Sequence, residues 1–118
     1  MIISTEIGPL TLGYVGSNLI CEFGTHAIDR APPKKLVLQL QQYFKGKRIN
    51  TFDAPLPPSP PFMQKCWLAC RNIPYGETIT YGALAKAAGS PKAARAAGQA
   101  MRNNPTSIIT PCHRVIAS

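Results

Sequence analysis

A proline-rich segment divides this chain of 118 residues into two parts of similar size. Residues 51–61 contain five prolines, which restrict the backbone, remove amide donors and favour an extended conformation. A helix or a central strand does not continue through such a segment. We therefore predict a lobe at residues 1–50, a linker at 51–61 and a second lobe at 62–118.

The first lobe is predicted to be a small antiparallel sheet with one helix. Three runs alternate apolar and polar residues, as half-buried strands do. The three runs are residues 2–6, 10–14 and 19–23. Turns are expected at Gly8–Pro9 and at 16–18. Apolar residues then recur at helical spacing over 35–44, and Gly46 ends this helix.

The second lobe is predicted to be mainly helical, with helices at 62–71, 81–88 and 91–103 and a short β stretch at 77–80. Ser90 is expected to cap the last helix, with a proline in its first position. Two helices joined by a tight turn with glycine form the helix-turn-helix signature. The predicted fold class is α+β, with an antiparallel sheet and a helix in the first lobe and a winged-helix-like second lobe.

The chain is strongly basic, with 13 Lys and Arg against 5 Asp and Glu, a net charge of +8 and a pI of about 9.7. Such a balance favours an anionic partner, with nucleic acid first and a membrane surface second. No apolar stretch reaches the roughly 18 residues of a membrane span, and the N-terminus has no secretion signal. We expect a cytoplasmic protein, or a nuclear one in a eukaryote, that is a monomer.

The last predicted helix carries an unusual surface. Arg95, Gly98 and Arg102 recur at spacings of three and four and so share one face. Ala94 and Gly98 leave a strip of this helix nearly bare of side chains. Such a strip suits close packing against another helix. With arginines beside it and excess positive charge, it also suits a confined DNA groove, which is the interpretation that we favour.

Cys112 is followed directly by His113 and Arg114. Cysteine attacks as the thiolate, so a histidine base and a cationic neighbour would activate it. Taken alone, the segment also fits a buried structural cysteine at a strand end. Neighbouring side chains of a strand point to opposite faces, so the chain must bend here or a water must connect the pair. A nucleophile that follows a DNA-binding helix suggests chemistry on a flipped base, whose place Arg95 would fill.

The other cysteines show no catalytic pattern. Cys66 and Cys70 are four residues apart on a predicted helix and are interpreted as core residues. All four thiols are expected to be reduced, because no export signal is present. Cys21 and His26 would supply only half of a metal site.

Five motifs, which cover about half of the chain, closely resemble methylated-DNA–protein-cysteine methyltransferases, the O6-alkylguanine-DNA alkyltransferases. Their order and spacing make the resemblance specific. The motifs are IPYGET at 73–78, YGxLA at 81–85, GSPKAARAAG at 89–98, MRxNP at 101–105 and PCHRVI at 111–116. The first half of the chain resembles the variable N-terminal lobe of this family.

The resemblance implies DNA repair in which an alkyl group passes irreversibly from O6-alkylguanine to Cys112 in one displacement. It implies that His113 activates the thiol through a water and that Tyr81 assists base flipping and protonates the leaving guanine. It further implies that Arg95 replaces the flipped base and that Asn104 orders the turn behind the site. The expected partner is double-stranded DNA that contains O6-alkylguanine.

The resemblance also implies a wider set of contacts. Met101 and Val115 would line the base pocket. The expected DNA-contacting residues are Tyr81, Gly82, Ser90, Ala94, Arg95, Gly98, Arg102 and Ser118. Some members of the family hold zinc in the first lobe, but only Cys21 and His26 match ligand positions. We therefore expect no cofactor.

One departure from the family concerns the end of the sequence. Members continue past the cysteine motif with a glycine-rich loop and a final helix, whose glutamate orients the histidine. This sequence ends at Ser118, so we expect a truncated second lobe with exposed apolar surface near Cys112. The alternative function is a sensor that flips and binds the alkylated base without efficient transfer. A helix-turn-helix regulator with an incidental cysteine is a third hypothesis, and a cysteine hydrolase is a distant fourth.

Overall fold

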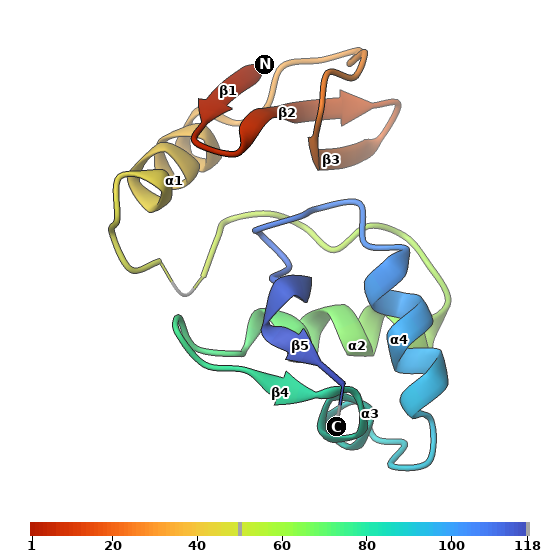
Figure 1. Ribbon diagram of the computed structural model, residues 1–118. Coiled ribbons are helices and arrows are strands. Elements are labelled where there is room, and N and C mark those ends of the chain that lie inside the picture. Colours follow the sequence, from red (N-terminus) through yellow and green to blue (C-terminus); the bar gives the residue numbers. More distant parts are fainter. Residues whose placement is uncertain (50, 118) are drawn as a thin grey trace.

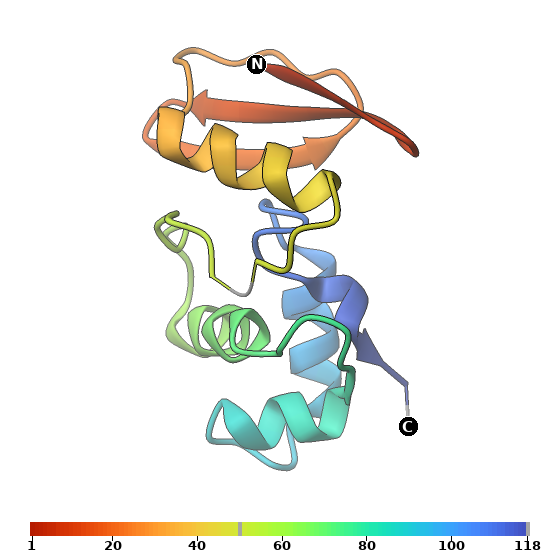
Figure 2. The ribbon, with the colours of Figure 1, turned by 90° about the vertical axis from the view of Figure 1, so that its left-hand side faces the viewer.

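The computed structural model describes residues 1–49 and 51–117. The chain forms an upper and a lower lobe, joined by an extended segment (Figure 1). The upper lobe holds an antiparallel sheet in the order β1-β2-β3, with β1 at Ile2–Thr5, β2 at Gly8–Val15 and β3 at Asn18–Phe23. Helix α1, Lys34–Phe44, lies across one face of this sheet (Figure 2). The expected sheet and helix are confirmed.

The central strand β2 is covered on both faces. Leu10 and Leu12 point into the core under α1, while Thr11 is equally buried on the other face. The Thr11 hydroxyl donates to Gly24 O at 2.7 Å and accepts from His26 N at 3.1 Å, so its burial leaves no unpaired group. The upper core consists of Ile3, Leu10, Leu12, Leu19, Cys21, Leu36, Leu40, Phe52 and Ile109.

The first turn differs from the expected one. Gly8 already lies in β2 and pairs with Thr5, so the chain turns at residues 6–7 rather than at Gly8–Pro9. The Thr5 hydroxyl explains the shift, because it donates to Gly8 O at 2.6 Å and accepts from Ile7 N at 3.3 Å. Threonine hydroxyls close turns in this way.

The lower lobe contains helices α2, Pro61–Arg71, α3, Tyr81–Ala87, and α4, Ala94–Arg102. Short strands β4, Ile79–Thr80, and β5, Val115–Ile116, pair in parallel, and the 3₁₀ turn η1, Cys112–Arg114, precedes β5. Trp67 of α2 packs in the core and donates its indole N–H to Ala100 O at 2.8 Å. The fold class is α+β, as the sequence predicts.

Helix α4 begins three residues later than expected. Ser90 and Pro91 do not cap it, because Ala93 N donates to Ser90 O at 3.0 Å and closes a turn before the helix starts. Serine and proline at the first two positions suit such a turn as well as they suit a helix start. The two residues therefore shape the connection between α3 and α4 instead of the helix itself.

The segment between α4 and η1 rises to the upper lobe and returns (Figure 1). Cys21 N donates to Pro105 O at 2.9 Å, and Ser107 N donates to Cys21 O at 2.7 Å. Ile109 is buried in the upper core, so residues far apart in the chain join the two lobes. In the part of the chain that the structure describes, no helix has the length and apolar character needed to cross a membrane.

Candidate active site

An open pocket of about 430 Å³ lies where α3, α4 and the η1 turn meet. Three separate segments supply its walls, so it exists only in the folded lobe. Its lining residues are Tyr81, Arg95, Gly98, Gln99, Met101, Arg102 and Cys112. The structure thus brings together the thiol, both arginines of the predicted DNA-facing helix surface and the aromatic residue at the start of α3.

Cys112 is half-buried and begins the η1 turn. Its amide donates to Thr110 O at 2.8 Å, and Arg114 N donates to Pro111 O at 2.9 Å, so the chain bends at the cysteine. Burial raises the pKa of the Cys21 and Cys70 thiols to about 12. Cys112 therefore differs from these two thiols in facing a pocket rather than a core.

His113 turns away from that pocket. It lines a second pocket of about 310 Å³, between α1 and the start of β4, together with Tyr43 and Glu77. The residue is exposed overall, but desolvation of part of its ring, and then the positive charge of Arg114, lower its pKa below the ordinary 6.5. Within residues 1–49 and 51–117, no hydrogen bond holds its ring. The bend does not bring His113 and Cys112 into one pocket, so a proton passing between them needs a relay such as water.

Arg114 supports the turn rather than facing solvent. It is buried, it donates from Nη1 to Ile73 O at 2.8 Å, and its guanidinium lies 5.4 Å from the centre of the Tyr75 ring. These contacts tie the end of η1 to the chain before β4. A charged hydrogen bond of this kind is stronger than a neutral one.

Helix α3 presents Tyr81 at its first position. The Thr80 hydroxyl caps the helix by accepting from Ala83 N at 3.1 Å, which fixes the direction of the first turn. The Tyr81 ring lies against Gly98 of α4, whose Cα has room for a Cβ at 3.9 Å from the ring. Arg95 and Arg102 are exposed beside it. The bare strip of α4 is therefore partly covered by the Tyr81 ring of α3, between two exposed arginines.

The remaining predicted contact residues lie at varied places. Gly82 is the second residue of α3, Ser90 lies in the turn before α4, and Ala94 is the half-buried first residue of α4. Met101 lines the pocket, but Val115 pairs with Ile79 inside the lower core and is not among the lining residues. Ser118 lies outside the described residues.

Asn104 joins the two ends of the segment before the cysteine. Its amide Nδ2 donates to Thr110 O at 2.8 Å, and its Oδ1 accepts from Thr106 N at 3.0 Å. These contacts close the turn between α4 and η1, and the role of Asn104 in ordering it for the reaction stays a prediction. Gln99, Thr106 and Thr110 are site features that sequence reasoning missed, because none of them belongs to a motif of reactive residues.

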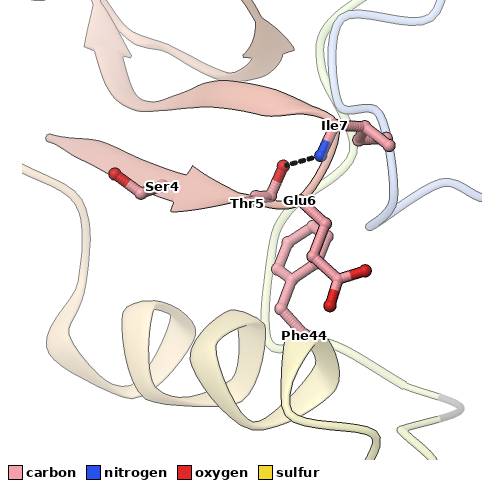
Figure 3. Close-up of a pocket in the computed structure, with 5 residues that line it drawn as sticks. All are labelled: Ser4, Thr5, Glu6, Ile7 and Phe44. Atoms are coloured by element: carbon pink, nitrogen blue, oxygen red, sulfur yellow. Dashed lines mark hydrogen bonds between the residues drawn. The ribbon is translucent and has the colours of Figure 1, made fainter.

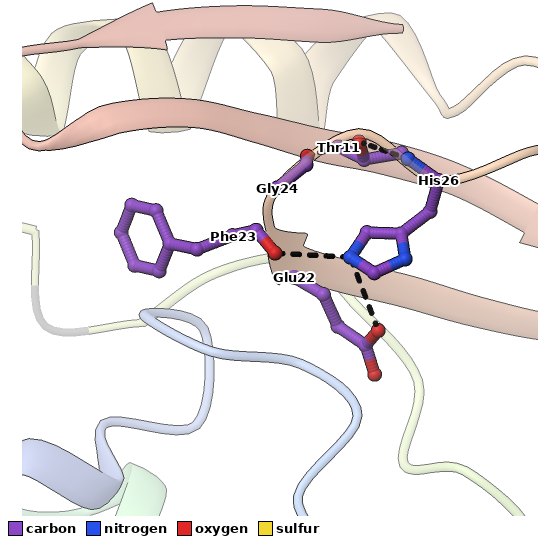
Figure 4. A network of polar contacts seen from close by, with 5 residues as sticks. All are labelled: Thr11, Glu22, Phe23, Gly24 and His26. Atoms are coloured by element: carbon purple, nitrogen blue, oxygen red, sulfur yellow. Dashed lines mark hydrogen bonds and ion pairs between the residues drawn. The ribbon is translucent and has the colours of Figure 1, made fainter.

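The residues of the upper lobe do not fit zinc. Cys21 is fully buried in the core, whereas His26 is exposed and bonds through Nε2 to Phe23 O at 2.9 Å (Figure 4). Glu22 lies 3.8 Å from the same nitrogen, on the strand face opposite to Cys21. Among residues 1–49 and 51–117 there is no group of three or more His, Cys, Asp or Glu side chains that could hold a metal ion.

A further open pocket of about 560 Å³ lies on the upper lobe between the β1–β2 turn and the end of α1 (Figure 3). It is lined by Ser4, Thr5, Glu6, Ile7 and Phe44. Its lining residues include no cysteine or histidine, and Glu6 is the charged residue among them. Size alone therefore does not identify the reactive site of this chain.

Comparison with known proteins agrees with this geometry. A family model described as "6-O-methylguanine DNA methyltransferase, DNA binding domain" matches residues 61–118. A methylated-DNA–protein-cysteine methyltransferase of Mycobacterium bovis is 42% identical over 127 residues, which cover 98% of this chain and 76% of the relative. This chain belongs to the methylated-DNA–protein-cysteine methyltransferase family. The resemblance inferred from the motifs is confirmed.

Other members of the family extend the comparison. The constitutive enzyme of Bacillus subtilis is 54% identical over 79 residues, which cover 66% of this chain and 47% of the relative. The crystal structure of Mycobacterium tuberculosis OGT in complex with DNA has a TM-score of 0.80 and 41% identity, and it covers 99% of this chain and 77% of that one. The chain spans about half the length of the Bacillus and Methanosarcina relatives that it matches.

Proposed function

We propose that this chain accepts an alkyl group from O6-alkylguanine in DNA onto the Sγ atom of Cys112. The observation that carries the proposal is the pocket in which this thiol lies beside Tyr81 and beside Arg95 of the second helix of a helix-turn-helix. A nucleophile placed there meets a base only after the base leaves the stack.

Double-stranded DNA is the proposed partner because of the charge and shape of the lower lobe. From residue 62 onward, the sequence contains seven basic residues and one acidic residue, Glu77. Arg95 and Arg102 are exposed on either side of Gly98, so the backbone of α4 can approach a groove while both guanidiniums reach phosphates. Arg95 would enter the space that the flipped base leaves.

The reaction is a single displacement. The proton of Cys112 passes to a water, which gives a proton to His113. The resulting thiolate attacks the alkyl carbon. The bond between that carbon and guanine O6 breaks, its electron pair stays on guanine, and the Tyr81 hydroxyl supplies a proton. The thioether product is stable, so each chain reacts once. The lowered pKa of His113 leaves its ring neutral at pH 7, as a proton acceptor must be.

Intact-mass measurement tests the proposal. After incubation with a duplex that contains O6-methylguanine, the chain should gain the mass of one methyl group, and peptide mapping should place that group on Cys112. Cys112→Ser should gain nothing while still binding the duplex. An unchanged mass for the native sequence, with binding intact, would refute alkyl transfer.

The alternative is a sensor that binds the flipped base without efficient transfer. It is favoured by the His113 ring, which faces a different pocket from Cys112 and has no hydrogen-bond partner in the described chain. A sensor would bind the alkylated duplex more tightly than the unmodified duplex and would leave both the lesion and the thiol unchanged.

A further inference from the structure

Arg71, the last residue of α2, binds two segments that are distant in the chain. Its Nε donates to the Thr110 hydroxyl at 2.9 Å, just before the cysteine. Its Nη1 donates to Ala54 O at 2.7 Å, and its Nη2 donates to Pro55 O at 3.3 Å. One planar guanidinium therefore joins α2, the proline-rich segment and the segment that leads to the reactive thiol.

Thr110 connects this clamp to Cys112. The residue is fully buried, and its carbonyl accepts both from Cys112 N at 2.8 Å and from Asn104 Nδ2 at 2.8 Å. Its hydroxyl also lies 3.0 Å from the Thr106 hydroxyl, which is 3.2 Å from Asn104 Oδ1. A displacement of Thr110 therefore moves the amide of the acceptor cysteine directly.

The segment that Thr110 ends contains a residue in a strained backbone conformation. Ile108 has a φ of 72°, a left-handed conformation that β-branched residues avoid. Such a conformation persists only where the surrounding structure imposes it. Part of the restraint lies within the segment, where Thr110 N donates to Thr106 O at 2.8 Å. The rest comes from outside it, from Cys21 of β3 on one side and from Arg71 on the other.

All the hydrogen bonds of the Arg71 guanidinium go to uncharged oxygens. Arg71 is partly buried and forms no ion pair through these bonds, so a neutral side chain would serve simple packing equally well. A rigid fork that reaches two segments at once is a property of arginine that lysine lacks. The choice of residue therefore indicates a geometric role.

We propose that Arg71 is a positioning residue for alkyl transfer, which acts through Thr110 to hold Cys112 against the pocket. This inference rests on the proposed function of the Cys112 pocket. It adds a coupling to that function, because the same guanidinium binds the segment that leads to the upper lobe. Changes in that segment then reach the reactive thiol through a single side chain.

The test separates DNA binding from chemistry. In Arg71→Met, single-turnover transfer from an O6-methylguanine duplex at saturating DNA should slow about tenfold to a hundredfold, because small misplacements of a reacting atom have effects of this size. The dissociation constant for the duplex should change by less than about twofold, since Arg71 does not line the pocket. Arg71→Lys should recover little of the rate, because it loses the fork.

A double-mutant cycle identifies the path. Thr110→Val should slow the saturated rate in the same way, and the two changes together should cost less than the product of their separate effects. The matched control is Lys65→Met, which removes an exposed charge from the same helix and should leave the saturated rate unchanged. A rate loss that is explained by the unfolded fraction of Arg71→Met, or that multiplies independently with Thr110→Val, would overturn the proposal.

A second measurement does not depend on the proposed function. Hydrogen exchange of the Cys112 amide reports its bond to Thr110 O even in a chain that transfers nothing. Exchange there should accelerate at least about tenfold in Arg71→Met and remain unchanged in Lys65→Met. If the native chain fails to transfer but this acceleration is seen, the proposed function fails and the positioning role stands. Unchanged exchange at Cys112 would refute the positioning role.

Discussion

At the scale of single residues, the surroundings of Cys112 set it apart from the other cysteines. Cys21 and Cys70 are fully buried, and burial raises the pKa of both thiols to about 12, so neither forms a thiolate near neutral pH. Cys112 is half-buried at the edge of a pocket. His113 belongs to the same turn but faces another pocket, which makes the path of the proton a question of solvent access.

The pH dependence of transfer follows from His113. Its folded pKa lies below 6.5, so the ring is neutral at pH 7 and can act as a base. It stops acting as a base when the pH falls through the folded pKa, because the ring is then protonated. The transfer rate should therefore show an acid limb with a midpoint below pH 6.5. Nuclear magnetic resonance titration of the His113 ring should give the same midpoint, with His113→Gln to assign the signal.

Folding stability should follow the same group. The unfolded chain takes up its proton at about pH 6.5 and the folded chain takes it up at lower pH. The contribution of His113 to folding is thus complete above pH 6.5 and is lost as the pH falls through the folded pKa. A midpoint above pH 6.5 in the transfer rate or in the nuclear magnetic resonance titration would contradict the environment described for this ring.

At the scale of elements, α4 must pack against the lower core and also present a basic surface beside α3. Helix α4 buries Ala97, Ala100 and Met101 against the lower core and exposes Arg95 and Arg102. Gly98 lowers the intrinsic stability of this helix, yet a Cβ there would meet the Tyr81 ring only at an ordinary 3.9 Å. Packing within the protein does not require the glycine, which points to a requirement from the partner.

Replacement of Gly98 by alanine should therefore separate stability from binding. Gly98→Ala should raise the free energy of unfolding by up to about 1 kcal/mol, because alanine favours the helix. Affinity for duplex DNA should fall about tenfold, which equals ~1.4 kcal/mol, because a methyl group keeps α4 from the groove. Urea unfolding and fluorescence anisotropy measure the two quantities. Ala87→Gly in α3 is the control and should lower stability without changing affinity.

At the scale of the whole molecule, the segment from 103 to 111 makes the two lobes interdependent. It pairs with β3 at Cys21 and places Ile109 in the upper core before the chain reaches the thiol. Ile116, four residues beyond Cys112, is 47% exposed and so leaves apolar surface near the end of the described chain. The two isoleucines thus have opposite environments within one short stretch.

Removal of the Ile109 side chain should affect both lobes. Ile109→Ala should lower the free energy of unfolding by about 2–4 kcal/mol, as expected for truncation of a buried isoleucine. The unfolding transition followed by the fluorescence of Trp67, in the other lobe, should shift to lower denaturant concentration, because the same segment anchors the turn at Cys112. Ile116→Ala should change stability by less than about 1 kcal/mol. An unmoved Trp67 transition in Ile109→Ala would show that the lobes unfold independently.

Sequence and spacing by themselves determined the types of most elements, the family and the candidate nucleophile. Alternation marked β1 to β3, and a glycine between two helical patterns marked α3 and α4, because these signals act within one element. The resemblance of the five motifs to the family implied a shared site for Tyr81, Arg95 and Cys112, and the structure brings all three into one pocket. Ser90 and Pro91 misled the prediction of where α4 begins, because a turn and a helix start use the same residues.

Only the tertiary structure decided how the reactive turn is held. Arg71 and Thr110 are 39 residues apart, and no local pattern relates an arginine at the end of a helix to a threonine in a distant loop. The separate pockets of Cys112 and His113 likewise depend on the 3₁₀ turn and on what packs against each of its sides. Contacts of this kind arise from the packing of elements, whose relative positions are set by the whole core rather than by neighbouring residues.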